Sequence, residues 1–234
     1  LINEPSYAPK DFLWQNRPFY DEFERKAWIE WVYRKHGKDP INLSILWKDS
    51  ISPLSLPQSK EFAYSPSIEN RKYRKVMDFH LFSQDVFSEW AKKMSSTIKK
   101  ISGKTLVTVG QDEAGTSFSP SPQFHYDSVD YTCIHTWWNN SDLLWDGVMT
   151  KVPEKPNLVQ ETGIMRLEDI DGNLWRSSEE SWKLLERKFA YAFASRSAGA
   201  VQWIWNINPY QPIDNEAIIG IFRVDGTAKP ELDV

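Results

Sequence analysis

The sequence is poor in the residues on which several classes of protein depend. Cys133 is the single cysteine in 234 residues, so the chain can form neither an internal disulfide nor a cysteine-rich metal site. No stretch approaches the roughly 18 uninterrupted apolar residues that span a bilayer. The net charge is only −4, and the basic residues are scattered, without the dense patch that nucleic acid requires. We therefore expect neither a membrane nor a nucleic acid as a partner.

The motifs of three common enzyme classes are missing as well. The chain has four histidines, which are scattered and so do not favour a metal-binding cluster: His36, His80, His125 and His135. No Gly-x-Ser-x-Gly nucleophile elbow is present, and no glycine-rich phosphate loop follows a predicted strand. We expect no metal and no cofactor, and nothing in the sequence indicates a cellular compartment.

Aromatic residues, by contrast, are plentiful. The chain contains 12 tryptophans within an otherwise ordinary globular composition of 41% hydrophobic and 26% charged residues. Sugar rings stack on flat aromatic faces, although large aromatic side chains also fill protein cores. The tryptophans therefore make carbohydrate a candidate ligand.

Helix and strand patterns alternate along the chain. Apolar residues at helical spacing predict a helix over 20–35, closed by Gly37, and a longer one over 73–101, closed by Gly103. The stretch 177–180 forms a capping box before a third helix. Short apolar runs predict four strands, at 106–109, 131–135, 157–160 and 200–205.

Two stretches show neither pattern. Residues 48–70 are rich in serine and proline and predict a long irregular excursion. Residues 139–156 are too short and irregular for a helix to be predicted. Loops as long as the first inside a compact domain are usually functional or disordered.

The alternation predicts an α/β fold with parallel strands, because parallel strands need crossover connections. A doubly wound sheet and a (β/α)8 TIM barrel both fit, and the missing phosphate loop favours the barrel. The chain opens on 1–4 as if on the last residues of a buried strand. We therefore expect residues 1–234 to be the C-terminal part of one catalytic barrel domain, supplying roughly strands 4 to 8. The N-terminal half would come from the same or a separate polypeptide.

In such a barrel the active site collects at the C-terminal ends of the strands. The predicted ends are dominated by carboxylates and aromatic residues: Asn3–Glu4, Gln111–Glu113, His135–Trp137, Glu161 and Trp203–Asn206. Retaining glycoside hydrolysis needs two carboxyl groups, one that donates a proton and one that attacks the anomeric carbon. The strand ends therefore point to sugar chemistry.

Four of these ends resemble those of clan A retaining glycoside hydrolases, in the same order. The tripeptide 3–5 resembles the end of strand four, where Glu is the acid/base and the preceding Asn binds the sugar 2-hydroxyl. The stretch 158–163 resembles the strand-seven end that carries the nucleophile. Residues 134–137 resemble the strand-six end, with Trp137 where Tyr is common, and 199–203 resembles a strand-eight end with a sugar-stacking Trp.

Within that clan, the chain is similar to family 42 β-galactosidases and related β-glycosidases. A helix with tryptophans at 28–31, then His36-Gly37, then the stretch from Asn42 to Trp47 follow the family's order, although the last spacing is one residue longer. The resemblance covers most of the chain and implies a β-linked, galactose-like substrate.

The resemblance implies a role for each residue at the strand ends. Glu4 would be the acid/base and Glu161 the nucleophile of a double displacement, with an oligosaccharide or glycoside as substrate. Substrate binding would fall to Asn3, Gln111, Asp112, Glu113, His135, Trp137, Trp203 and Trp205. A non-catalytic carbohydrate-binding barrel is the rival, but a pure binder has no physical need for both glutamates.

The polar residues 111–113 and the excursion 48–70 favour an exo-acting enzyme. Carboxylates accept paired hydrogen bonds from the free hydroxyls of a terminal sugar, and an excursion folded over the site would close one end of a cleft. An endo-acting β-glycanase of the same clan, similar to a cellulase or mannanase, is the alternative.

Overall fold

The computed structural model describes residues 2–12, 15–49, 54–63, 71–112, 120–137, 141–164, 175–210 and 217–233. Its α-helices are α1 (Glu22–His36), α2 (Pro40–Trp47), α3 (Arg71–Ile101), α4 (Pro122–His125), α5 (Asp142–Met149) and α6 (Ser178–Ala194). Its strands are β1 (Thr132–Thr136), β2 (Asn157–Thr162) and β3 (Ala200–Gln202). Short 3-10 turns are η1 (Lys10–Phe12), η2 (Ser59–Ala63), η3 (Tyr126–Ser128) and η4 (Pro230–Asp233).

The three predicted helices are confirmed as α1, α3 and α6, and their ends follow from local chemistry. Asp21 caps α1 by accepting a hydrogen bond from the Glu24 backbone, and Gly37 ends the helix at a φ of 83°. Ser177 and Glu180 form the predicted capping box of α6. These signals lie within a few residues, so the sequence reveals them directly.

Three shorter helices, α2, α4 and α5, were not predicted from the sequence. The stretch 139–156 was not expected to contain a helix, but it contains α5, whose buried residues are Leu143 and Gly147. A face that small gives too short a periodic signal to recognise. α2 begins on Pro40, which suits the first turn of a helix because it lacks an N–H that would be unpaired there.

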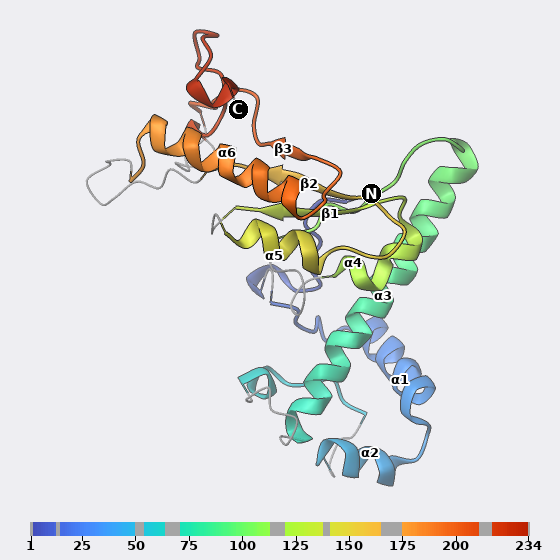
Figure 1. Cartoon of the computed structure of the whole chain (residues 1–234). Helices are drawn as coiled ribbons and strands as arrows, with labels where there is room; N and C mark the ends of the chain where they lie inside the picture. The colour runs from blue at the N-terminus through green and yellow to red at the C-terminus, as the bar shows by residue number, and fades with distance from the viewer. Residues whose placement is uncertain are drawn as a thin grey trace.

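The three strands form one parallel sheet in the order β1-β2-β3, with α5 and α6 as crossovers (Figure 1). The predictions for the first two strands are confirmed to within two residues, whereas β3 ends at Gln202, short of the predicted 205. α5 and α6 pack on the same face of the sheet, because Leu143 and Ala192 share one core cluster with Ile134 and Val159. A doubly wound sheet has helices on both faces, whereas the two crossovers of this sheet lie on one face, as in a (β/α) barrel.

The predicted strand 106–109 is wrong as a regular strand, although it lies in the expected place. Val107 exchanges hydrogen bonds with Asp130, through both the backbone and the side chain of Asp130. Gly110 bonds on its other side to Ile2 and Glu4. Side chains thus replace part of the ladder, and only an isolated parallel bridge between Asn3 and Gly110 remains.

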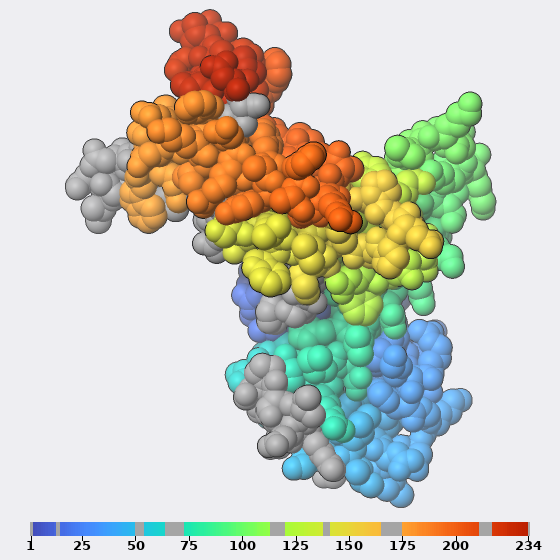
Figure 2. Space-filling view, in the orientation of Figure 1, coloured from blue at the N-terminus to red at the C-terminus, as the bar shows by residue number. Residues whose placement is uncertain are grey.

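A second region is built almost wholly from helices. We call α1, α2 and the first half of α3 the helical region, and β1, β2, β3, α5 and α6 the sheet region. α3 runs from one to the other, and the space-filling view shows two masses joined by a narrower middle (Figures 1 and 2). The helical region has a core rich in aromatic residues: Trp28, Trp31, Val32, Leu43, Trp47, Leu56, Phe79 and Phe82.

Residues 54–63 of the excursion 48–70 pack on this aromatic core and on α3. The idea that the excursion closes the site therefore gains no support from the residues described, and 50–53 and 64–70 lie outside them. None of the described helices combines the length and the apolar character needed to cross a bilayer.

Candidate active site

Three side chains from distant parts of the chain meet on the face of the sheet opposite α5 and α6. His135 lies on β1 and Glu161 on β2, and their Cα atoms are partners in the parallel ladder. The register shifts just before this pair, since Ile134 pairs with Val159 and leaves Gln160 as an extra residue. A β-bulge of this kind turns the following side chain to the other face. The bulge therefore brings Glu161 to the same side as His135.

Glu4 reaches the cluster from the N-terminal residues. Its backbone N–H donates to the Gly110 carbonyl at 2.8 Å, and the Gly110 N–H donates to Ile2 at 2.9 Å. A Cβ at 110 would lie 2.2 Å from Oδ1 of Asn3, so glycine lets the Asn3 side chain lie close to this backbone. Glu4 has a φ of 45°, a left-handed conformation that is costly for a side-chain-bearing residue before proline. Strained backbone of this kind clusters at functional sites.

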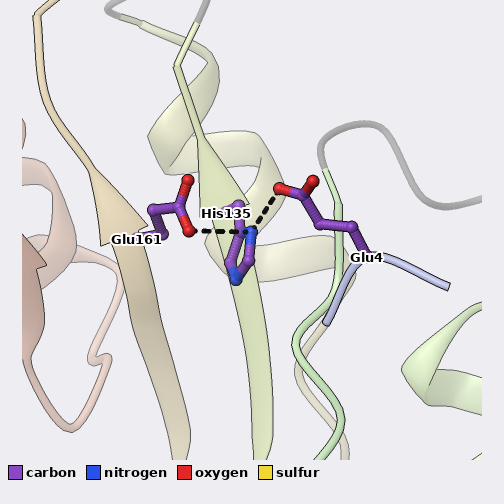
Figure 3. A group of neighbouring side chains, drawn as sticks. All are labelled: Glu4, His135 and Glu161. Carbon is purple, nitrogen blue, oxygen red and sulfur yellow. Dashed lines mark hydrogen bonds and ion pairs between the residues drawn. The ribbon is translucent and has the colours of Figure 1, made fainter. Parts of the chain in front are cut away.

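The geometry of the cluster is tight (Figure 3). His135 Nδ1 lies 2.6 Å from Oε1 of Glu4 and 3.5 Å from Oε2 of Glu161, so the imidazole stands between the two carboxylates. The three residues place one N or O atom each within 4.8 Å of one another. The Glu4 and Glu161 side chains keep 31% and 15% of their surface exposed, whereas His135 keeps 1%. The carboxylates thus remain accessible while the histidine is enclosed.

The pKa of His135 is set by opposing effects. Burial alone would lower it, because a charged imidazolium loses its hydration. The hydrogen bond to Glu4 and the negative charges of Glu161 and Glu4 outweigh burial and raise the pKa of His135 above its ordinary value. The imidazole therefore favours its protonated form, which donates to carboxylates.

Trp137, directly after β1, has a polar role that its residue type did not suggest. Its Nε1 donates to Oε1 of Glu161 at 2.9 Å. The ring packs on Gly163, where a Cβ would lie 2.5 Å from a ring carbon. Trp137 is 8% exposed, so it acts on the carboxylate by hydrogen bonding from a buried position.

The other predicted site residues differ in how far they are exposed. Asn3 is exposed beside Gly110, Asp112 is half-buried, and Gln111 is fully buried, with its carbonyl accepting the His135 backbone N–H at 2.7 Å. Glu113 lies outside the described residues. Trp203 and Trp205, after β3, are 41% and 69% exposed.

Trp205 borders a cavity of about 580 Å³ beyond the end of β3. Its ring lies 4.6 Å, centroid to centroid, from Phe222. Tyr210, at 93% exposed, and Arg223 also line the cavity, together with Asn206, Ile207, Asn208, Pro209, Val224 and Gly226. Flat aromatic faces beside amide and guanidinium donors are the groups that bind sugar rings and hydroxyls.

Lys188, a buried lysine on α6, was not among the predicted site residues. It occupies a position in the apolar stripe of the helix, between Leu185 and Ala192. A lysine at such a position is a signal that was available, because lysine is almost never fully buried without partners. The glycines at 110 and 163 were also missed, since the contacts that require them involve residues far along the chain.

The same three site residues also supply the donor types of a divalent-cation site. Glu4, His135 and Glu161 offer one imidazole nitrogen and two carboxylates. Among transition metals this donor set suits zinc. The experiment proposed below therefore includes a chelator.

Comparisons with known proteins add evidence on the fold. No protein family and no curated sequence matches the chain. Among solved structures, an exo-β-agarase matches with a TM-score of 0.65 and 13% identity, over 99% of this chain and 33% of that one. A β-galactosidase from Halorubrum lacusprofundi matches with a TM-score of 0.64 and 11% identity, over 90% and 34%.

A GH42 β-galactosidase from G. stearothermophilus matches with a TM-score of 0.60 and 13% identity, over 88% of this chain and 32% of that one. The chain thus spans about a third of the length of these solved structures. At such low identity the likeness concerns the fold alone. The chain shares part of the fold of glycoside hydrolases.

Proposed function

We propose that this chain carries the catalytic carboxylates of a retaining β-glycoside hydrolase, with Glu161 as nucleophile and Glu4 as acid/base. The observation that supports this most is the pair of partly exposed carboxylates with oxygens within 4.8 Å of each other. Retaining enzymes keep their two carboxyl groups about 5 to 5.5 Å apart, whereas inverting enzymes leave room for a water molecule.

The reaction would proceed in two displacements. The Glu161 carboxylate attacks the anomeric carbon while the bond to the leaving oxygen breaks, and that oxygen takes the proton of Glu4. Glu4, now ionised, removes a proton from a water molecule, whose oxygen attacks the anomeric carbon and releases Glu161. The sugar keeps its configuration because each displacement inverts it once.

The neighbours of the two carboxylates suit these roles. Trp137 donates to one oxygen of Glu161 and leaves the other oxygen near His135. Hydrogen bonds to a carboxylate favour its ionised form, which the nucleophile needs. His135 is hydrogen-bonded to Glu4 at 2.6 Å and can share the proton that Glu4 donates and recovers.

The substrate would be a β-linked oligosaccharide or glycoside, with galactose-like sugars first among candidates. We extend the proposal to exo action, supported by Asp112 at the end of 106–112 and by the likeness in fold to an exo-β-agarase. Residues 1–234 would be the C-terminal part of one barrel, completed by a further N-terminal part. This agrees with a chain that spans about a third of its structural neighbours.

The proposal is tested with a panel of chromogenic aryl β-glycosides. The panel is run on this chain and on the longest polypeptide that contains it. We expect hydrolysis of at least one glycoside, loss of at least about 10³-fold in Glu161→Ala, and no effect of a chelator. Azide should restore turnover in Glu161→Ala with inverted configuration, because a small anion occupies the vacated position.

The matched control is Glu179→Ala, since Glu179 is an exposed carboxylate on α6 that pairs with Lys183. It should leave turnover unchanged. Silence of both polypeptides on every glycoside, with sugar binding retained, would favour a carbohydrate-binding barrel. Loss of activity with the chelator would instead favour a metal held by Glu4, His135 and Glu161.

A further inference from the structure

Lys188 is the one described lysine that is both completely enclosed and in contact with the ends of two strands. Its side chain is 0% exposed. Nζ donates to the carbonyl oxygens of Thr136 at 3.1 Å, Trp137 at 3.0 Å and Gly163 at 2.9 Å. These residues lie at the end of β1, directly after it, and directly after β2.

The number of acceptors indicates the form of the amine. An ammonium has three protons, and three carbonyl oxygens lie within hydrogen-bond distance of Nζ. Burying a charge costs several kcal/mol unless hydrogen bonds compensate for the lost hydration. An apolar side chain at this position would pack on α6 without that cost. The charge therefore calls for an explanation beyond packing.

The carbonyls that Lys188 holds belong to residues around Glu161. Trp137 is the residue whose indole N–H donates to Oε1 of Glu161. Gly163 is the residue on which the Trp137 ring rests, and it follows Glu161 by two positions. The ammonium thus fixes the backbone on both sides of the hydrogen bond between Trp137 and Glu161.

We propose that Lys188 is a positioning residue for the nucleophile: it locks the strand ends that aim Trp137 at Glu161. This inference rests on the proposed function of Glu161. Lys188 acts on Glu161 through the backbone that carries Trp137 and Gly163.

The test compares two buried lysines of the same chain. Lys188→Met removes the charge and the three hydrogen bonds but keeps the length of the side chain. Lys75→Met is the control, because Lys75 is 1% exposed and contacts Asp49 and Ser55 in the helical region. Both variants should lose stability, so stability alone does not separate the roles.

Activity does separate them. We expect Lys188→Met to lower kcat by about tenfold or more with KM changed less than about twofold, because misplaced reacting groups slow the chemical step. Lys188→Arg, which keeps hydrogen-bond donors for the three carbonyl oxygens, should recover part of the lost kcat. Lys75→Met should match the parent in kcat and KM.

A measurement without turnover keeps this inference separate from the proposed function. The indole N–H of Trp137, which donates to Glu161, is observed by NMR in protein labelled with ¹⁵N-tryptophan, with Trp137→Phe identifying the signal. Its chemical shift should change in Lys188→Met and stay unchanged in Lys75→Met. If Lys188→Met fails to fold, Lys188→Gln removes the same charge. An unchanged Trp137 signal in the neutral Lys188 variants overturns the inference, whether or not any glycoside is hydrolysed.

Discussion

The helical region and the sheet region bury different kinds of side chain. In the helical region Trp28 stacks between Trp31 and Trp47, with ring centroids 5.6 and 5.8 Å apart. In the sheet region the core cluster consists of one leucine, one isoleucine, one valine and one alanine. The polar groups of the sheet region gather instead at the strand ends, where His135 and Lys188 are enclosed.

This difference separates stability from chemistry. Large aromatic side chains in mutual contact bury much apolar surface and resist rearrangement. The sheet region fixes its strand ends with hydrogen bonds to buried charged groups, which are costly to bury and sensitive to their partners. We therefore expect substitutions in the helical region to change the free energy of unfolding, and substitutions at the strand ends to change catalysis.

The largest effect is expected from a pair of tryptophan substitutions. Trp28→Ala removes a side chain that is 0% exposed and should cost about 3 to 5 kcal/mol of unfolding free energy. Trp203→Ala removes one that is 41% exposed and should cost about 1 kcal/mol or less, while lowering kcat/KM. Urea unfolding and glycoside hydrolysis measure the two quantities. Equal losses of unfolding free energy in the two variants would contradict the expected difference between the regions.

The two regions should also respond oppositely to pH. Burial lowers the pKa of His80, on α3, to about 4, with Arg17 adding to the effect. Below about pH 6.5, His80 binds a proton in the unfolded chain but not in the folded chain. The folded state therefore loses stability as the pH falls below this value. His125 is lowered to about 4 by burial and acts in the same direction. His135 has a raised pKa, so its contribution is complete below about 6.5 and is lost as pH rises through the folded pKa.

Urea unfolding of the parent, His80→Gln and His135→Gln between pH 5 and 8 would measure this contrast. His80→Gln should weaken the loss of stability on the acid side, and His135→Gln should weaken it on the alkaline side. A variant of either histidine whose pH dependence matches that of the parent would contradict the contrast. These pH values bracket the ordinary titration of histidine at about 6.5.

The smallest effect is expected at the cavity beyond β3. Trp205→Ala and Tyr210→Ala should raise KM by a few fold on β-linked oligosaccharides and leave aryl monoglycosides unaffected, because stacking of this kind contributes about 1 kcal/mol. Monosaccharide should be the earliest product in parent and variants. A spread of intermediate oligosaccharides would indicate endo action, and equal KM values would mean that the cavity binds no part of the substrate.

Much of this architecture was predictable because its signals are local. The capping box at 177–180, the stop at Gly37 and the apolar runs of β1 and β2 each occupy a few residues, and each led to the right element. The predicted strand at 106–109 failed because pairing depends on neighbours, and Asp130 supplies a side chain where a ladder bond was expected. Helix α5 was missed because its buried face is only two residues.

The sequence by itself determined the order of the elements and put Glu4, His135 and Glu161 at or near the ends of apolar runs. It did not determine that they meet. Glu4 and His135 are separated by 131 positions, and Glu4 is held beside His135 by its backbone hydrogen bond to Gly110. The bulge at Gln160 decided which face Glu161 occupies, and the packing of α6 decided that Lys188 holds both strand ends. Local patterns reflect neighbours along the chain, whereas these contacts depend on the register and packing of distant segments, which only the folded chain establishes.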